Sequence, residues 1–232
     1  MSRTIRYEQA VYGSFPFWSR GYAMLAASPG CLPEWRDAMR GACQRFGERP
    51  AGVDRFRSRF TLPLSRSAWM IVQVDSSGRD DHGRPGALVF HALFVSSWSH
   101  RRAGGAPWAF APAFRTDWTA ADQDAILPQG SFKPARPETA TTEPLDLRVE
   151  PIVEALSRRR RVVVQTPSPA DELFQAVWRR LPGSTRRRTS IATWAFGNAN
   201  PFDLLAAPRL GALRLDGGEL VLPAVAGSNS QA

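Results

Sequence analysis

The chain has 232 residues, of which 43% are hydrophobic and 22% are charged, and this composition is typical of a folded globular domain rather than of a disordered chain. Its formal net charge of +9 rests almost wholly on arginine, because Lys133 is the only lysine. No run of 18 apolar residues occurs, and the first residues lack the apolar core of a signal peptide. We therefore predict a cytoplasmic protein with no membrane partner.

The basic charge has two interpretations. A strongly basic chain normally indicates a polyanionic partner such as nucleic acid. Here the arginine excess accompanies many alanine, glycine and proline residues, which is the coding bias of a GC-rich genome. Such a bias adds arginine at exposed positions without selection for phosphate contacts, so the charge alone does not assign a nucleic-acid function.

The first half of the chain contains several strand patterns and one clear helix. Apolar residues recur at helical spacing from Pro33 to Phe46, with proline in the first turn and Gly47 at the end. Two near-continuous apolar runs are typical of central, doubly buried strands. Strands are predicted at residues 5–12, 22–26, 68–75 and 87–95.

The second half begins with a change of composition. Residues 96–148 are rich in Pro, Gly, Ala, Ser and Thr, which predicts an irregular insert, a short helix near 116–126 and a sub-domain boundary. Helices are predicted at 149–159 and from Ser168 to Leu181, the second one capped by Ser168. Strands are predicted at residues 162–165, 189–196 and 202–207, followed by a hairpin over 213–222.

These elements predict a single compact α+β domain over residues 1–226. Its mixed, largely antiparallel sheet would carry three to four packed helices. Residues 227–232 are expected to form a disordered tail.

The sequence contains no recognisable catalytic or metal-binding motif. Cys31 and Cys43 have no CxxC neighbour and would lie about 18 Å apart along a helix, too far for a disulfide. His82, His91 and His100 recur at an odd spacing, which places neighbours on opposite faces of a strand. No Walker A spacing occurs, so the chain is not expected to hydrolyse a nucleoside triphosphate. We predict no catalytic residue, no metal and no cofactor.

The most concentrated polar element is the segment from Asp80 to Gly86. Its Arg84-Pro85-Gly86-Ala87 sequence matches a type II turn between two central strands. An alternative is that Arg84 and the loop amides form an anion-binding concavity.

A hydrolase site is a further alternative at the same segment. It would use Asp80, Asp81, His82 and His91, with one of them as general base. His91 lies inside an apolar strand, where a core histidine with satisfied hydrogen bonds is the competing interpretation. Enclosure of His91 in the core would exclude it as a base.

Two arginine runs each stand directly before a predicted strand, so both can lie along one edge of the sheet and form a positive patch. Such a patch predicts nucleic-acid binding that weakens steeply with salt. The alternative is solvated charge at the ends of elements, where a basic side chain also favours a helix C-terminus. The patch comprises Arg158, Arg159, Arg160, Arg161, Arg186, Arg187 and Arg188.

The loop after the first predicted strand is unusually aromatic, with the sequence Phe15-Pro16-Phe17-Trp18. Exposed aromatic side chains commonly anchor protein interfaces. We expect a protein-binding surface here, joined by the turn at Arg84 and by His91. Its residues are Phe15, Phe17, Trp18, Arg20, Tyr22, Arg84 and His91.

Four short motifs occur in order within the first hundred residues: Gln9-Ala10-Val11-Tyr12-Gly13, Gly21-Tyr22-Ala23-Met24-Leu25-Ala26-Ala27-Ser28-Pro29, Gly83-Arg84-Pro85-Gly86 and His91-Ala92-Leu93. A looser set follows at Leu181-Pro182 and Ser190-Ile191-Ala192-Thr193-Trp194. Together they resemble the N-terminal domain of the bacterial GTPase-associated protein family. The resemblance implies a non-enzymatic adaptor in an NTP-dependent bacterial conflict or signalling system, accompanied by a GTPase. Members of this family often continue into further domains.

The expected function is thus a non-enzymatic protein-interaction adaptor whose partner is a GTPase or another NTPase. A nucleic-acid-binding protein that uses the arginine runs is the first alternative. A hydrolase built around Asp80, Asp81, His82 and His91 is the second. The sequence leaves the oligomeric state open.

Overall fold

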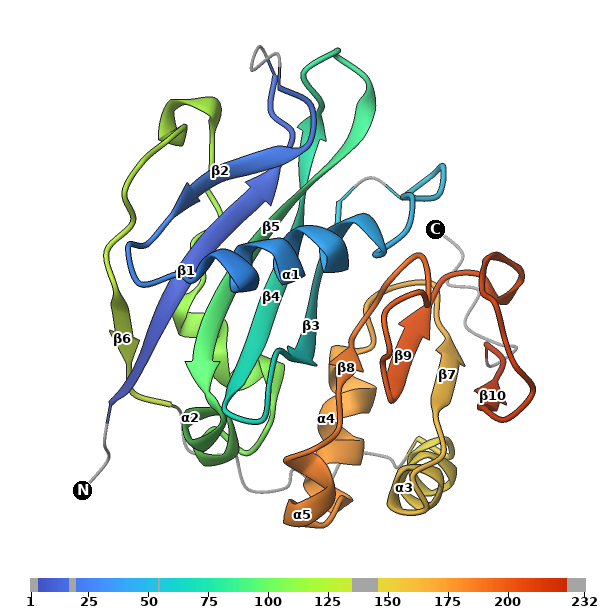
Figure 1. Ribbon diagram of the computed structural model, residues 1–232. Coiled ribbons are helices and arrows are strands. Elements are labelled where there is room, and N and C mark those ends of the chain that lie inside the picture. The colour runs from blue at the N-terminus through green and yellow to red at the C-terminus, as the bar shows by residue number, and fades with distance from the viewer. Residues whose placement is uncertain (1–3, 17–19, 54, 135–145, 225–232) are drawn as a thin grey trace.

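The computed structural model describes residues 4–16, 20–53, 55–134 and 146–224. Ten strands form one sheet (Figure 1). They are β1 (Ile5–Gly13), β2 (Ala23–Ala27), β3 (Arg57–Pro63), β4 (Ala68–Arg79), β5 (Pro85–Ser96), β6 (Gly130–Phe132), β7 (Val162–Gln165), β8 (Ile191–Ala192), β9 (Leu204–Ala207) and β10 (Leu220–Leu222).

The sheet has an antiparallel and a parallel half. The strand order is β10-β7-β9-β8-β3-β4-β5-β1-β2, and β6 pairs with the beginning of β1. Pairing is antiparallel from β8 through β3 to β2, whereas β8, β9, β7 and β10 pair in parallel. The predicted α+β class, with a mixed and largely antiparallel sheet, is confirmed.

Helices surround this sheet. Three of them have nine or more residues: α1 (Pro33–Gln44), α3 (Val149–Ser157) and α4 (Asp171–Arg180). Two are short, α2 (Ser97–Arg102) and α5 (Gly183–Arg186). Three 3₁₀ turns complete the described elements: η1 (Pro107–Ala113), η2 (Ala120–Asp122) and η3 (Leu210–Ala212). None of the helices in the described ranges has the length and apolar character needed to span a bilayer.

Both faces of the antiparallel half are covered. Figure 1 shows α1 crossing one face, where Met39 and Phe46 join the same core cluster as Phe90 of β5. On the opposite face, Leu93 of β5 clusters with Phe110 of η1. Because alternate residues of a strand point to opposite faces, two covered faces explain why β4 and β5 read as near-continuous apolar runs.

Parts of the insert pack on the sheet as ordered structure. The described part of residues 96–148 contains α2, η1, η2 and β6. The short helix predicted within 116–126 forms only as the three-residue η2, because the backbone of Asp124 and Leu127 donates to the carbonyls of Leu25 and Ala27 in β2. Residues 135–145 of the insert and the predicted tail at 227–232 lie outside the described residues.

Three further predictions near the C-terminal half need correction. Helix α4 begins at Asp171 rather than at a Ser168 cap, because the Ala170 N–H donates to the Thr193 carbonyl and keeps that residue outside the helix. The strand predicted at 189–196 is only two residues long. The hairpin at 213–222 is wrong, since β10 pairs in parallel with β7.

Candidate functional site: an arginine-lined pocket

The parallel half of the sheet determines where the arginine runs lie. Arg161 directly precedes β7, and two residues separate the end of the second run, Arg186–Arg188, from β8. Since β7, β9 and β8 run in parallel, the segments that precede them meet at the same end of the sheet. Both runs therefore lie at the same end of the sheet.

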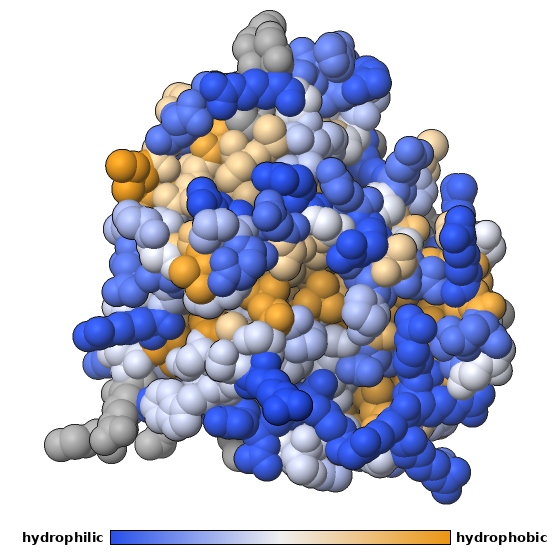
Figure 2. Space-filling model, viewed as in Figure 1, coloured by the Kyte–Doolittle hydropathy of each residue, from blue (hydrophilic) through white to orange (hydrophobic). Residues whose placement is uncertain are grey.

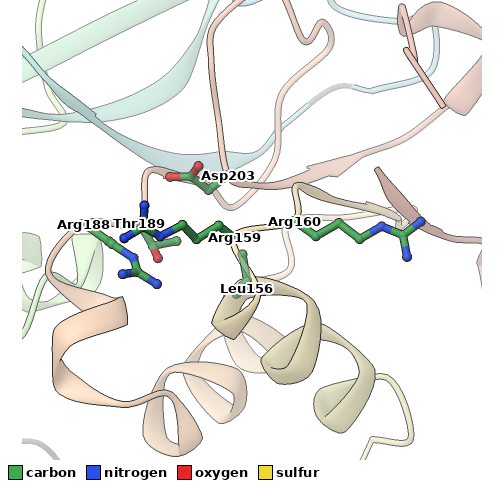
Figure 3. Close-up of a pocket in the computed structure, with 6 residues that line it drawn as sticks. All are labelled: Leu156, Arg159, Arg160, Arg188, Thr189 and Asp203. Carbon is green, nitrogen blue, oxygen red and sulfur yellow. The ribbon is translucent and has the colours of Figure 1, made fainter. Parts of the chain in front are cut away.

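A pocket of about 210 Å³ opens at this end of the sheet. It lies between the turn that follows α3 and the segment that connects α5 to β8 (Figure 3). Arg159 and Arg188 reach the pocket from these two different segments, and Figure 3 shows the Arg159 side chain directed toward Arg188 and Thr189. The full lining is Leu156, Arg159, Arg160, Arg188, Thr189 and Asp203.

Arg159 has an unusual backbone conformation for its residue type. Its φ is +60°, in the left-handed region that favours glycine. The Arg160 N–H donates to the Ala155 carbonyl at 2.9 Å and the Arg159 N–H donates to the Leu156 carbonyl at 3.1 Å. This is the Schellman pattern that ends a helix, in which glycine usually holds the position of Arg159. An arginine there costs about 1 kcal/mol relative to glycine.

The seven arginines of the predicted patch differ in how they are held. Three are held by the protein itself: Arg158 pairs with Glu154 at 2.8 Å, Arg160 donates to the carbonyls of Gly218 and Glu219, and Arg161 donates to that of Phe202. Arg186 has a buried Nε without a hydrogen-bond partner among the described residues, so this side chain is partly enclosed. Within the described ranges, the side chains of Arg159, Arg187 and Arg188 have no hydrogen-bond or ion-pair partner. Figure 3 shows that the Arg160 side chain, which bonds the Gly218 and Glu219 carbonyls, points away from Arg159 and Arg188.

The remaining lining groups have anchored positions. The Oδ2 atom of Asp203 accepts the Ser190 N–H at 2.7 Å and the Ser190 hydroxyl at 2.8 Å. The Thr189 hydroxyl donates to the Thr185 carbonyl at 2.9 Å. The pocket thus combines two guanidinium groups that have no partner among the described residues with a carboxylate at a fixed position. Leu156 and Thr189 are close to the arginine runs in sequence, but neither residue type marks a binding site. Asp203 could not be predicted from sequence, because only the parallel strand order brings it beside the arginines.

The predicted protein-binding surface is only partly formed as expected. The expectation that Phe15 is exposed is wrong: the side chain is 2% exposed and packs in a cluster with Val11 and Leu25. Arg20 and Tyr22 are exposed, and the Tyr22 hydroxyl accepts the Leu88 N–H at 2.8 Å. Phe17 and Trp18 lie outside the described residues. The role of Arg20 and Tyr22 in partner binding stays a prediction.

The polar turn before β5 is structural. One Asp80 carboxylate oxygen accepts the N–H groups of His82 and Arg84 at 2.9 and 2.8 Å, and the other accepts Arg84 Nε at 2.7 Å. Arg84 and the loop amides, which the sequence suggested as an anion-binding concavity, therefore already bind the Asp80 carboxylate. Asp81 accepts the Gly21 N–H at 2.7 Å, which ties this turn to the aromatic loop. These bonds lower the pKa values of both carboxyl groups, as expected for ionised acceptors.

His91 is enclosed and both ring nitrogens are satisfied. It is 2% exposed, so its predicted place on a binding surface is wrong. Nδ1 accepts the Arg115 N–H at 3.2 Å, which leaves the proton on Nε2, and Nε2 donates to Gln9 Oε1 at 2.9 Å. Burial lowers the pKa of His91 to about 3. The ring is neutral and out of reach of a substrate, so it cannot act as the general base of a hydrolase.

No metal centre forms from the described residues. Among them, no group of three or more His, Cys, Asp and Glu side chains could hold a metal ion. Cys31 and Cys43 are both free and buried, and burial raises the pKa of Cys31 to about 11. Both thiols are therefore protonated near neutral pH.

Comparison with protein-family models, with curated proteins and with solved structures finds no match to this chain.

Proposed function

We propose that this protein is a non-enzymatic binding protein that holds nucleic acid at the arginine-lined pocket. The observation that supports this proposal is the meeting of Arg159 and Arg188 in one pocket, without a partner for either guanidinium in the described part of the chain. Two like charges in one pocket repel each other, and a bound anion removes that repulsion. Guanidinium groups donate forked pairs of hydrogen bonds that match phosphate oxygens.

The salt dependence of binding tests this proposal. We would titrate a labelled single-stranded RNA of about 20 nucleotides by fluorescence anisotropy at several salt concentrations. The double variant Arg159→Gln/Arg188→Gln is expected to bind more weakly at low salt. Each lost phosphate contact should make the slope of log affinity against log salt shallower by about 0.7. The slope of the double variant should therefore be shallower than that of the wild type by about 1.4.

A matched control separates the pocket from overall charge. The double variant Arg158→Gln/Arg20→Gln removes the same charge from two arginines that already pair with Glu154 and Asp124. It should keep nearly the full slope. Equal losses in both double variants would show that only net charge matters, and would contradict a site at the pocket.

A second candidate function is supported by a different surface. Beside β2, the side chains of Tyr22 and Ile126 are 44% and 81% exposed, and Figure 2 shows pale and orange residues gathered over this strand. Exposed apolar side chains of this kind are frequent in protein interfaces. Together with the motif resemblance, this surface supports an adaptor that binds a GTPase.

A pull-down at high salt tests the adaptor. The expected result is a co-purifying GTPase that Ile126→Asp abolishes, while Leu215→Asp, at a position 39% exposed in another part of the surface, retains it. Both positions are exposed, so neither variant should disturb folding. Absence of a GTPase from the wild-type pull-down would contradict this candidate.

A further inference from the structure

The pocket is a small, partly open concavity with a mixed lining. Its volume is about 210 Å³, and the apolar side chain of Leu156 forms part of its lining. The carboxylate of Asp203 lies in the same lining and is held there by the Ser190 N–H and hydroxyl. A strand crossing the pocket would bring consecutive phosphates past this carboxylate, which repels them. The arrangement favours one phosphate group near Arg159 and Arg188.

Both arginines are carried by anchored backbone. Arg159 occupies the left-handed position of the helix-ending turn, fixed by the bonds to Ala155 and Leu156. The Arg188 N–H donates to the Thr185 carbonyl at 3.1 Å, and the next residue makes two further bonds to that carbonyl. The directions in which the two side chains leave the backbone are therefore set before any ligand arrives, which lowers the entropic cost of binding.

We infer that the pocket binds the terminal phosphate monoester of a nucleic-acid chain. A terminal phosphate carries about two negative charges at neutral pH and has three free oxygens, enough for a forked pair of bonds from each guanidinium. An internal phosphodiester has one charge and two free oxygens. This inference rests on the proposed nucleic-acid function and narrows it to the end of the chain.

The experiment compares three RNA probes of about 10 nucleotides, a length within the range of single-strand binding sites. One carries a 5′-phosphate, one a 3′-phosphate and one no terminal phosphate, and each has the same internal fluorophore. The wild-type protein should bind one phosphorylated probe about tenfold more tightly than the probe with two hydroxyl ends. Inorganic phosphate should compete for the pocket and reduce the difference in affinity between the probes. The probe that binds more tightly shows which end of the RNA is recognised.

Arg159→Gly is the decisive variant. Glycine suits the left-handed backbone of residue 159, so the variant should fold at least as stably as the wild type while losing the preference for the phosphorylated end. Arg188→Gln should lose the same preference. Arg158→Gln, which removes the neighbouring arginine that pairs with Glu154, should retain it.

The possible failures can be distinguished. Equal affinity for all three probes, still weakened by Arg159→Gly, would overturn the terminal-phosphate inference and leave the proposed function in place. Affinity that Arg159→Gly and Arg188→Gln leave unchanged for every probe would overturn both. If the preference for the phosphorylated end survives Arg159→Gly, the terminal phosphate of the RNA binds elsewhere on the protein. This result would also overturn the inference.

Discussion

At the scale of single residues, the most informative position is Arg159. The turn after α3 has the hydrogen bonds of a helix end that glycine normally completes, yet arginine stands there with a φ of +60°. Strained backbone of this kind persists where the surrounding structure imposes it, and it is frequent at binding sites. The side chain placed by this strain is the one that meets Arg188 in the pocket.

The cost of this conformation is measurable. Arg159→Gly should raise the free energy of unfolding by about 1 kcal/mol, because glycine adopts positive φ without a Cβ clash. Chemical denaturation at neutral pH measures the change. Arg159→Gln keeps the Cβ and removes only the charge, so it should give a smaller gain.

The adjacent arginine provides the opposite control. Arg158 has a φ of −85°, where glycine brings only extra flexibility to the unfolded chain, so Arg158→Gly should lower stability by about 0.5–1 kcal/mol. A loss of stability in Arg159→Gly would show that the turn does not strain its arginine.

At the scale of elements, a histidine attaches the insert to the sheet. His91 of β5 accepts the Arg115 N–H from the insert and donates to Gln9 of β1, while the Gln9 amide donates to the Pro128 carbonyl at 2.8 Å. These bonds fasten both ends of the segment 115–128. The ring also packs edge-on against Phe114 and Trp118.

Removing the amide should release this segment before the sheet unfolds. Gln9→Leu leaves the His91 Nε2–H and the Pro128 carbonyl without partners, at a cost of about 2–3 kcal/mol. Because the β1–β5 ladder does not depend on this side chain, we expect faster hydrogen exchange and protease cleavage within residues 115–128.

The matched control is Gln129→Leu, whose amide bonds Glu8 at the surface and should change the exchange rates little. Unchanged exchange in Gln9→Leu, or release of the whole sheet together with the segment, would contradict this role of the bonds.

Elements with strong local patterns were predictable from sequence, whereas those set by distant partners were not. The apolar runs of β4 and β5 and the helical spacing of α1 identified these elements, since their signals lie within one segment. No local pattern predicts strand β3, and the glycine turn before β10 predicts a hairpin that does not form. The edge of β7 places β10 instead, where Arg160 donates to the carbonyls of Gly218 and Glu219.

The site was predictable in part. Each arginine run precedes a predicted strand, which predicts that the runs lie together, and the parallel order of β7, β9 and β8 brings them to the same end of the sheet. Which arginines are available could not be predicted from the sequence, since backbone carbonyls far along the chain hold Arg160 and Arg161. The same reason explains Phe15, whose burial depends on packing against Leu25 and Val11.

At the scale of the whole molecule, two enclosed histidines make the fold sensitive to acid. Burial lowers the pKa of His91 to about 3 and that of His100 to about 4. His100 stacks on Trp69 with the ring centroids 3.9 Å apart, and neither of its ring nitrogens has a hydrogen-bond partner in the described part of the chain. Both rings are neutral in the folded protein at pH values where an unfolded chain would protonate them.

The sign of the pH effect follows from these values. The ordinary histidine pKa is 6.5, so below this pH the unfolded chain binds protons that the folded chain does not. The free energy of unfolding is therefore not reduced by the two histidines above about pH 6.5. It falls as the pH decreases toward 4, by at most about 1.4 kcal/mol per pH unit for each histidine. Denaturant melts at a series of pH values between 8 and about 4.5 measure this slope.

His100→Phe isolates one of the two contributions. Phenylalanine keeps the stacking on Trp69 and has no nitrogen to protonate or to leave unpaired, so the slope below pH 6.5 should fall by about half while stability at pH 8 changes less. The carboxyl groups with lowered pKa, such as Asp80 and Asp122, lose their interactions only below about pH 4 and do not contribute in this range. An unchanged slope in His100→Phe would mean that His100 is protonated in the folded protein, and that the contact with Trp69 opens in mild acid.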